Sequence, residues 1–296
     1  MAGMMRHLVL FCTAALVAAC ATPFDLQGHR GTRGLRPENT LPAFAKALEI
    51  GVDTLELDTN VTRDGVVVVM HDRRLNPDVA RGPDGRWVSP PGLSIHQLTY
   101  AELSRYDVGR LRPGTDYAKE FPDQLAIDGT HAPRLSDVFA LVRTQGDRRV
   151  RFNIETKISP RAPDESPPPE EFARRLVDEI RAAGMQHRST IESFDWRTLA
   201  VVRRIAPEIP AVYLTYKMDD AVAKVREAGG KAWSPFYKDV DEARIREAHA
   251  AGIEVVVWTV NDPADMKRMV EWGVDGLITD RPDVFRRWVG FPPSRE

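Results

Sequence analysis

The segment from Gly28 to Asp72 contains four short motifs in which polar residues follow or interrupt apolar runs. In order, they are Gly28-His29-Arg30-Gly31, Arg36-Pro37-Glu38-Asn39-Thr40, Leu55-Glu56-Leu57-Asp58 and Val69-Met70-His71-Asp72. The apolar runs indicate strands, and residues Glu38 to Gly51 have the apolar spacing of one helical face. Histidines and carboxylates thus fall at the ends of predicted strands, where parallel α/β proteins keep their functional groups.

Outward from this segment, the chain keeps alternating strand-like and helix-like runs. The predicted strands are Phe24 to Gly28, Thr54 to Thr62, Val150 to Lys157, Thr190 to Phe194, Ala211 to Tyr216, Ala232 to Tyr237, Glu254 to Val260 and Asp275 to Thr279. Eight strand-to-helix units with right-handed crossovers predict a (β/α)8 TIM barrel over residues 24–290. An open, doubly wound parallel sheet is the alternative.

Residues 73–132 interrupt the alternation after the second strand and its hairpin partner. They are rich in proline and glycine, and only Ile95 to Tyr106 has a helical pattern, with Thr99 as the cap before Glu102. Leucine, tryptophan and tyrosine in this region favour a packed insertion subdomain over a disordered loop. We expect it to form part of the wall around the substrate.

The composition is that of an ordinary globular protein. The chain has 296 residues, 43% of them hydrophobic and 28% charged, which allows one large domain. A net charge of -2 gives no basic surface for a polyanion, so nucleic acid is not the expected partner.

Residues 1–19 have the pattern of an export signal. Arg6 and His7 precede an uncharged run from Leu8 to Ala19 that is too short to span a bilayer. The end of the run, Val17-Ala18-Ala19-Cys20, resembles a bacterial lipobox, which predicts a lipidated Cys20 and a periplasmic or membrane-anchored lipoprotein. Ordinary cleavage of the signal peptide, with Cys20 incidental, is the alternative. The membrane is expected as a partner only through this anchor, and the oligomeric state stays open.

Three carboxylates are predicted to meet at the mouth of the barrel. Glu56 and Asp58 are two residues apart on one strand and therefore face the same side, and Glu155 lies near the end of the next parallel strand. Carboxylates without cysteine ligands or a close histidine pair suit one hard divalent cation, Ca²⁺ or Mg²⁺. Alternatively, these acids are solvated strand ends, or they pair with Lys157, Arg30 or Arg36.

Two histidines flank the predicted metal site. His29 and His71 have the placement of a general acid and a general base, and Arg30 and Lys157 add fixed positive charge beside them. A cation, an arginine and a lysine at one place suit a substrate on whose anionic oxygens charge develops. The set therefore predicts phosphoryl transfer on a small molecule.

The same residues resemble the motifs of the glycerophosphodiester phosphodiesterase family. The matching motifs run from Gln27 to about Pro282 and are His29-Arg30-Gly31, Pro37-Glu38-Asn39-Thr40, Glu56-Leu57-Asp58, Asp64-Gly65, His71-Asp72, Glu155-Thr156-Lys157, Ser193-Phe194-Asp195, Trp258-Thr259-Val260-Asn261 and Asp275-Gly276-Leu277-Ile278-Thr279-Asp280. The resemblance implies a TIM barrel that hydrolyses glycerophosphodiesters to an alcohol and sn-glycerol 3-phosphate.

The resemblance also implies a role for each site residue. His29 and His71 would be the acid-base pair, and Glu56, Asp58 and Glu155 the ligands of one divalent cation. Arg30 and Lys157 would hold the phosphate, and Trp258 would pack against the glycerol carbons. Glu192 stands where many relatives have glutamine, which adds a fourth acid to the mouth.

Two other functions remain compatible with these motifs. One is a phospholipase D-like or cyclising phosphodiesterase that acts on lysolipids or intact phospholipids. The other is a non-catalytic envelope protein that binds phosphodiester head groups; the loss of a histidine or an acid would favour it, and none of these residues is missing.

Overall fold

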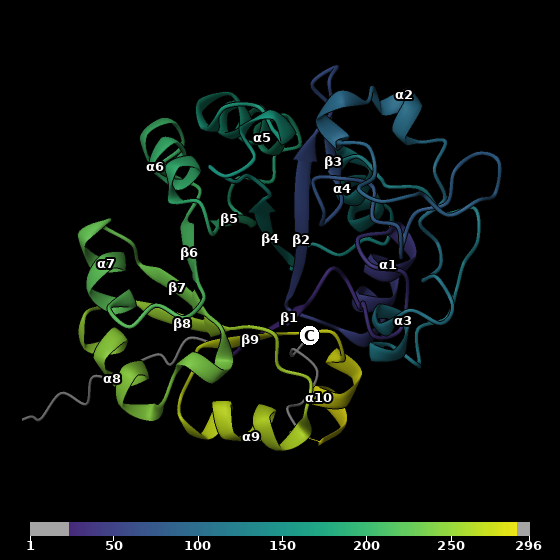
Figure 1. Ribbon diagram of the computed structural model, residues 1–296. Coiled ribbons are helices and arrows are strands. Elements are labelled where there is room, and N and C mark those ends of the chain that lie inside the picture. Colours follow the sequence, from purple (N-terminus) through teal and green to yellow (C-terminus); the bar gives the residue numbers. More distant parts are fainter. Residues whose placement is uncertain (1–23, 289–296) are drawn as a thin grey trace, which may run out of the picture.

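The computed structural model describes residues 24–288, and in this part of the chain nine strands form one sheet (Figure 1). The parallel strands are β1 (Asp25–Gly28), β2 (Thr54–Val61), β4 (Arg151–Thr156), β5 (Ser189–Ser193), β6 (Ala211–Thr215), β7 (Ala232–Pro235), β8 (Glu254–Val257) and β9 (Gly276–Thr279). Because β1 pairs with both β2 and β9, these strands close into a barrel. The predicted (β/α)8 barrel is confirmed, and the open sheet is excluded.

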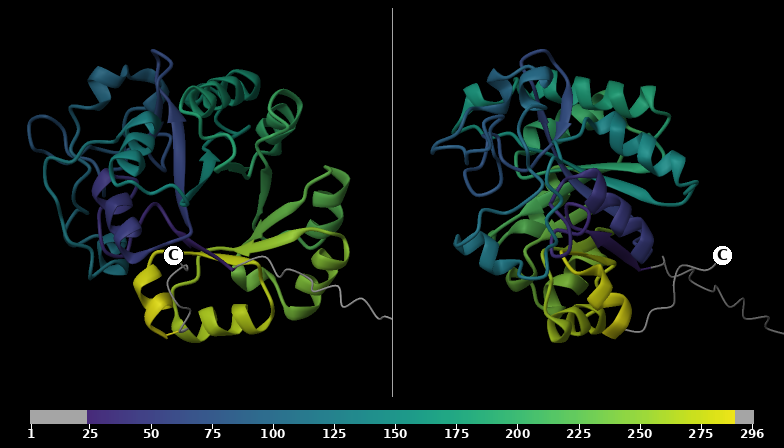
Figure 2. Two further views of the ribbon diagram at one scale, coloured as in Figure 1. Left: turned by 180° about the vertical axis from the view of Figure 1, so that it is seen from behind. Right: turned by 90° about the vertical axis from the view of Figure 1, so that its right-hand side faces the viewer.

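Helices follow the strands and cover the outside of the barrel (Figures 1 and 2). They are α1 (Leu41–Ile50), α4 (Leu135–Thr144), α5 (Pro169–Ala182), α6 (Trp196–Ile205), α7 (Ala221–Glu227), α8 (Glu242–Ala250), α9 (Pro263–Glu271) and α10 (Pro282–Trp288). Between the helices and the strands lies the main hydrophobic core. Leu55 and Leu57 on β2 belong to this core, so the alternate side chains, Glu56 and Asp58, face the interior of the barrel.

Helix α1 begins three residues later than the apolar pattern predicts. Asn39 has a left-handed backbone with φ of 55°, and the hydroxyl of Thr40 accepts a hydrogen bond from the amide of Ala43. Thr40 is therefore the N-cap, and Glu38 and Asn39 belong to the turn before the helix. This turn directs both side chains toward the barrel mouth rather than along the helix.

The insertion follows β3 (Val67–Val69), which pairs antiparallel with β2, and lies beside the barrel near α1 and α4 (Figure 1). A second hydrophobic cluster forms within it, centred on the fully buried Leu75 and Ile95. The predicted helix from Ile95 to Tyr106 is instead a 3-10 turn, η1 (Ile95–Gln97), followed by the short α2 (Tyr100–Leu103). Thr99 caps α2 with Glu102 in a capping box, which separates the two turns.

Three further short helices were not predicted from the sequence. The insertion contains α3 (Asp116–Glu120), and the loops after β4 and β7 contain the 3-10 turns η2 (Pro163–Glu165) and η3 (Tyr237–Asp239). Helix α3 has no buried residue, so its sequence carries no apolar periodicity.

The predicted signal peptide and Cys20 lie outside the described residues, as does the end of the predicted 24–290 domain. Among the helices of residues 24–288, none has both the length and the apolar character needed to cross a bilayer.

Candidate active site

The three carboxylates of the predicted metal site come together inside the barrel mouth. Glu56 and Asp58 lie two residues apart on β2, and the parallel register places Glu155 of β4 directly beside Asp58. Each offers an oxygen within 4.8 Å of the oxygens of the other two, and all three side chains are buried. They are therefore not solvated strand ends, and their oxygens are close enough together to hold one cation.

Two neighbouring cations offset only part of this negative charge. The ammonium of Lys157 lies 3.2 Å from Asp58 and 2.9 Å from Glu155, and Nε of Arg30 lies 3.2 Å from Asp58. The predicted alternative of ion pairs is thus partly correct, although Arg36 takes no part and donates to the carbonyl of Leu35.

The protonation equilibria of the three acids reflect this uneven pairing. Burial raises the pKa of Asp58, but Lys157 and Arg30 outweigh it and hold that pKa well below its usual range. Burial raises the pKa of Glu56 well above its usual range, with Asp58 adding to the effect, and raises the pKa of Glu155 to about 7. A bound divalent cation would offset the charge that these two acids resist carrying.

Glu192 adds a fourth buried acid to the same interior. It sits beside Glu155 in the register of β4 and β5, and its carboxylate accepts a hydrogen bond of 2.7 Å from the amide of Asn153. Burial, followed by repulsion from Glu155, raises its pKa to about 8. Glu192 is therefore largely protonated at neutral pH in the absence of a cation.

His29 stands at the end of β1 with its two ring nitrogens in different surroundings. Nδ1 lies 2.6 Å from the carboxylate of Asp280, which follows β9, and Nε2 lies 3.9 Å from Glu56. Arg33 donates two hydrogen bonds to Asp280, and Asn261 donates a third. This network fixes the ring and turns Nε2 toward the carboxylates.

The charge around His29 favours its neutral form. Burial, and to a smaller extent Arg33, lowers the pKa of His29 to about 4 against the opposing effect of Asp280. A neutral imidazole with Nδ1 bonded to a carboxylate presents its Nε2 lone pair, which is the form that accepts a proton.

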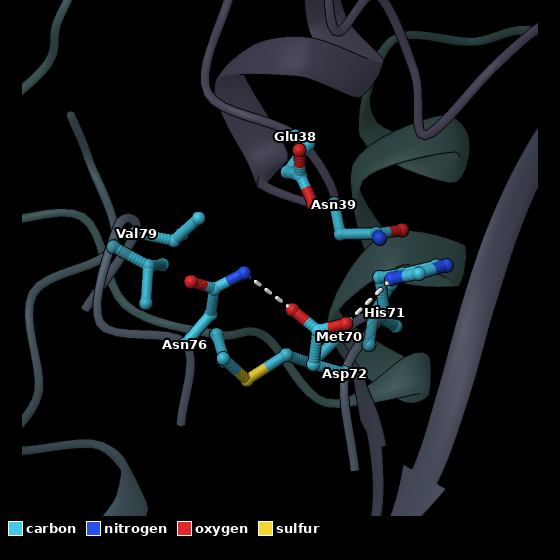
Figure 3. Close-up of a pocket in the computed structure, with 10 residues that line it drawn as sticks. Glu38, Asn39, Met70, His71, Asp72, Asn76 and Val79 are labelled. Atoms are coloured by element: carbon cyan, nitrogen blue, oxygen red, sulfur yellow. Dashed lines mark hydrogen bonds and ion pairs between the residues drawn. The ribbon is translucent and has the colours of Figure 1, made fainter. Parts of the chain in front are cut away.

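His71 reaches the same mouth from the loop after β3. Its Nδ1 lies 2.8 Å from Asp72, and Asn76 holds the other oxygen of Asp72 at 2.7 Å, as the dashed lines in Figure 3 show. The cavity in Figure 3 lies behind these residues and measures about 10 Å³, which is room for about one water molecule. This cavity is too small for a substrate.

Arg30 owes its position to a strained turn after β1. Its φ is 49°, and the next residue, Gly31, has φ of 82° with the carbonyl carbon of Ala43 only 2.7 Å from where a Cβ would be. The amide of Arg30 donates to Glu56, and its guanidinium donates to Glu38 at 2.8 Å. The turn therefore places both the backbone and the side chain of Arg30 beside the acids.

An open cleft of about 170 Å³ connects the histidines, the arginines and the carboxylates. Basic and imidazole side chains line one part of it, including His29, Arg30, Arg33, His71 and Lys157. Trp258, after β8, and Phe194, after β5, form an aromatic wall with ring centroids 5.4 Å apart. The structure thus brings together all eight site residues predicted from the sequence.

Several residues that hold the site in place were assigned no role from the sequence, although Asp280 is part of one of the quoted family motifs. Asp280 and Arg33 flank His29, and Tyr117 of α3 donates to Glu38. Asp280 directly follows the last strand, a position that could have singled it out. Nothing in the local sequence of Tyr117 indicates its contact, which is formed across 79 residues.

Comparisons with known proteins identify the family. Residues 29–284 match the sequence profile of the glycerophosphoryl diester phosphodiesterase family. A glycerophosphodiester phosphodiesterase of Caldanaerobacter subterraneus is 31% identical over 86% of this chain and 93% of its own length. The corresponding enzyme of Bacillus subtilis is 28% identical over 88% and 84% of the two chains.

Solved structures agree with the sequence matches. A Silicibacter pomeroyi protein assigned to the same family has a TM-score of 0.86 with 36% identity, covering 90% of this chain and 93% of its own. An Oleispira antarctica phosphodiesterase, whose structure holds the product sn-glycerol-3-phosphate, shares the fold, with a TM-score of 0.72 and 22% identity over 90% and 97% of the chains. Because the family match runs from the end of β1 into α10, the chain is an enzyme of the glycerophosphoryl diester phosphodiesterase family, which hydrolyses glycerophosphodiesters to glycerol 3-phosphate.

Proposed function

We propose that the protein hydrolyses glycerophosphodiesters with the help of one divalent cation and of two histidines that act as general acid and general base. The observation that carries this proposal is the convergence of His29 and His71 on one cleft with the buried carboxylates Glu56, Asp58 and Glu155. These carboxylates would hold Ca²⁺ or Mg²⁺, because a site made only of carboxylate oxygens suits hard ions. When bound, the ion supplies positive charge that polarises a phosphoryl oxygen.

The remaining charges position the substrate. Arg30 and Lys157 would hold the anionic phosphate, since both line the cleft and both are fixed beside Asp58. Trp258 would pack against the glycerol carbons, and its indole nitrogen is held by the carbonyl of Ser234 at 3.0 Å. The apolar wall and the cationic centre together orient one ester arm before any bond breaks.

The histidines move the protons. One imidazole takes a proton from the attacking oxygen, and the other donates a proton to the departing alcohol. The alcohol therefore leaves as a neutral molecule rather than as an alkoxide. Asp280 contacts Nδ1 of His29, and Asp72 contacts Nδ1 of His71. The Nε2 atom of each histidine is therefore free to transfer the proton. The attacking oxygen belongs to water or to the neighbouring glycerol hydroxyl, which would give a cyclic phosphate.

The decisive experiment measures glycerol 3-phosphate release from a panel of glycerophosphodiesters, with chelator and with Ca²⁺ or Mg²⁺ added back separately. Chelator should abolish turnover, and one of the two ions should restore it. His29→Ala and His71→Ala should each lower kcat on the order of 10²-fold or more while the fold is kept. His131→Ala is the matched control, because the ring of His131 contacts the carbonyl of Tyr106 outside the cleft.

Two outcomes would reject the proposal. Wild-type turnover in His71→Ala would remove the two-histidine mechanism, and full activity in chelator would remove the cation. Release of a cyclic phosphate, or cleavage of lysolipid in preference to glycerophosphocholine, would instead identify the cyclising or phospholipase D-like reaction.

We further propose that the protein is exported and anchored through lipidated Cys20, on the strength of the motif Val17-Ala18-Ala19-Cys20. Cys20→Ser should move the protein from the membrane fraction to the soluble periplasmic fraction. The mass of the mature N-terminus should show the acyl groups on Cys20. An unmodified N-terminus at Thr22, after the triplet Ala19-Cys20-Ala21, would reject the anchor and favour ordinary cleavage of the signal.

A further inference from the structure

We propose that a polar groove beside the catalytic cleft binds the departing alcohol, and that it selects hydroxyl-rich, uncharged or anionic head groups over quaternary ammonium head groups. The inference rests on the proposed function. It assigns a role to an open groove of about 530 Å³ between the start of the insertion and the loop after β4. We call this the Arg73 groove; its floor and sides include Asp72, Arg73, Arg74, Asn76 and Glu165.

The Arg73 groove begins at the reacting centre. His71 and Lys157 line both the catalytic cleft and the groove, so the two spaces meet at these side chains. A leaving alcohol in the groove would therefore lie next to an imidazole that can protonate it.

In the closed barrel, the strand before Trp258 lies opposite the strand that leads to the groove. Lys157 follows β4 and Trp258 follows β8, and these strands are four positions apart in the ring of eight in either direction. A diester whose phosphate lies between them extends one ester arm toward Trp258 and the other into the groove. If the glycerol arm packs on Trp258, the groove receives the head group.

The groove contains hydrogen-bond donors that the protein itself does not use. Arg73 and Arg74 share the carboxylate of Glu165, which each reaches through Nε, at 3.0 Å and 2.5 Å. Arg74 also uses Nη1 on the carbonyl of Gly92. Within residues 24–288, both terminal nitrogens of Arg73 and Nη2 of Arg74 donate no hydrogen bond to the protein, so they remain available to a ligand.

The lining also disfavours a bulky cation. Arg73 and Arg74 face the carboxylates Asp72 and Glu165, and Lys157 is already paired with Asp58 and Glu155, so no carboxylate of the groove is left without a cationic neighbour. No tryptophan, tyrosine or phenylalanine is among the described residues that line the groove, and aromatic faces are what binds quaternary ammonium groups. Hydroxyl or acidic oxygens, in contrast, can accept from the free guanidinium nitrogens.

The test compares kcat/KM for glycerophosphoglycerol, glycerophosphoinositol and glycerophosphocholine with the full-length, cation-loaded enzyme. We expect the two polyol diesters to be preferred about tenfold, the size of one charge-assisted hydrogen bond. Arg73→Gln should shrink this preference, and Arg73→Lys, which keeps the charge, should retain part of it. Arg110→Gln is the matched control, because Arg110 also pairs with an acid of the insertion, Asp128, but lies outside the groove.

Each outcome decides a different question. Equal or faster turnover of glycerophosphocholine would overturn the groove assignment and leave the proposed hydrolysis intact. An unchanged preference in folded Arg73→Gln would overturn the role of this arginine in the groove. Failure of the wild-type enzyme to cleave any of the three diesters would reject the proposed function, and the groove assignment with it.

Discussion

The histidine at the end of β1 depends on residues that are far from it in the sequence. Asp280 contacts His29 across 251 positions, and its own charge is held by Arg33 and Asn261. A carboxylate on Nδ1 selects the tautomer that leaves Nε2 free, as the outer ligands of metal-bound and catalytic histidines generally do. Asp280 is therefore a positioning residue for His29.

Replacing Asp280 with asparagine tests this role. We expect Asp280→Asn to lower kcat about 10- to 100-fold with little change in KM, because binding groups remain while His29 loses its preferred tautomer. The acid limb of the pH-rate profile should shift as well, which a purely structural defect would not cause. Asp283→Asn is the control, since Asp283 pairs with Arg281 outside the cleft. Normal kcat and an unchanged pH profile in folded Asp280→Asn would contradict the assignment.

At the scale of elements, the insertion is coupled to the catalytic centre through α3. The hydroxyl of Tyr117 donates to Glu38 and accepts hydrogen bonds from Arg30 at 3.5 Å and Arg33 at 3.3 Å. One side chain of the insertion thus touches both arginines of the cleft. The contact fixes the insertion relative to β1, which also fixes the Arg73 groove relative to the cleft.

Removal of the Tyr117 hydroxyl should make Arg30 and Arg33 less well positioned and leave the other site residues in place. We expect Tyr117→Phe to lower kcat/KM several-fold and the free energy of unfolding by about 1 kcal/mol, the usual contribution of one hydrogen bond. Kinetics and thermal denaturation of the purified variant measure the two effects. Tyr100→Phe is the control, because the ring of Tyr100 lies over Arg134 and not near the cleft. Wild-type kcat/KM in Tyr117→Phe would show that α3 does not support catalysis.

For the whole molecule, the buried acids make stability depend on the cation and on pH. Between about pH 7 and 8.5 the relevant groups are Glu155 and Glu192, whose pKa values burial raises to about 7 and about 8. A raised pKa stabilises the fold while the group is protonated, and this contribution is lost as the pH rises through the folded pKa. The lowered pKa values of His29 and His71 have the opposite effect, but at lower pH.

Thermal denaturation at pH 7 and pH 8.5, with chelator or with Ca²⁺ or Mg²⁺, measures this linkage. Without a cation, Tm should fall as the pH rises, and the bound cation should raise Tm more at pH 8.5, because it offsets the ionised carboxylates. Glu192→Gln keeps the acceptor for Asn153 and should flatten the pH dependence of the chelated protein. A Tm that rises with pH in chelator, or does not respond to either cation, would rule out this account.

The amino-acid sequence by itself determined the barrel and the positions of the acids on it. Eight repeats of an apolar strand and an amphipathic helix are local patterns, and the two-residue period of β2 alone places Glu56 and Asp58 on one face. Only the tertiary structure decided the start of α1, the helix α3 and the partners of the two histidines. These depend on side chains that barrel closure brings together, such as Asp280 beside His29 and Tyr117 beside Glu38, and contacts across such distances leave no periodic trace in the chain.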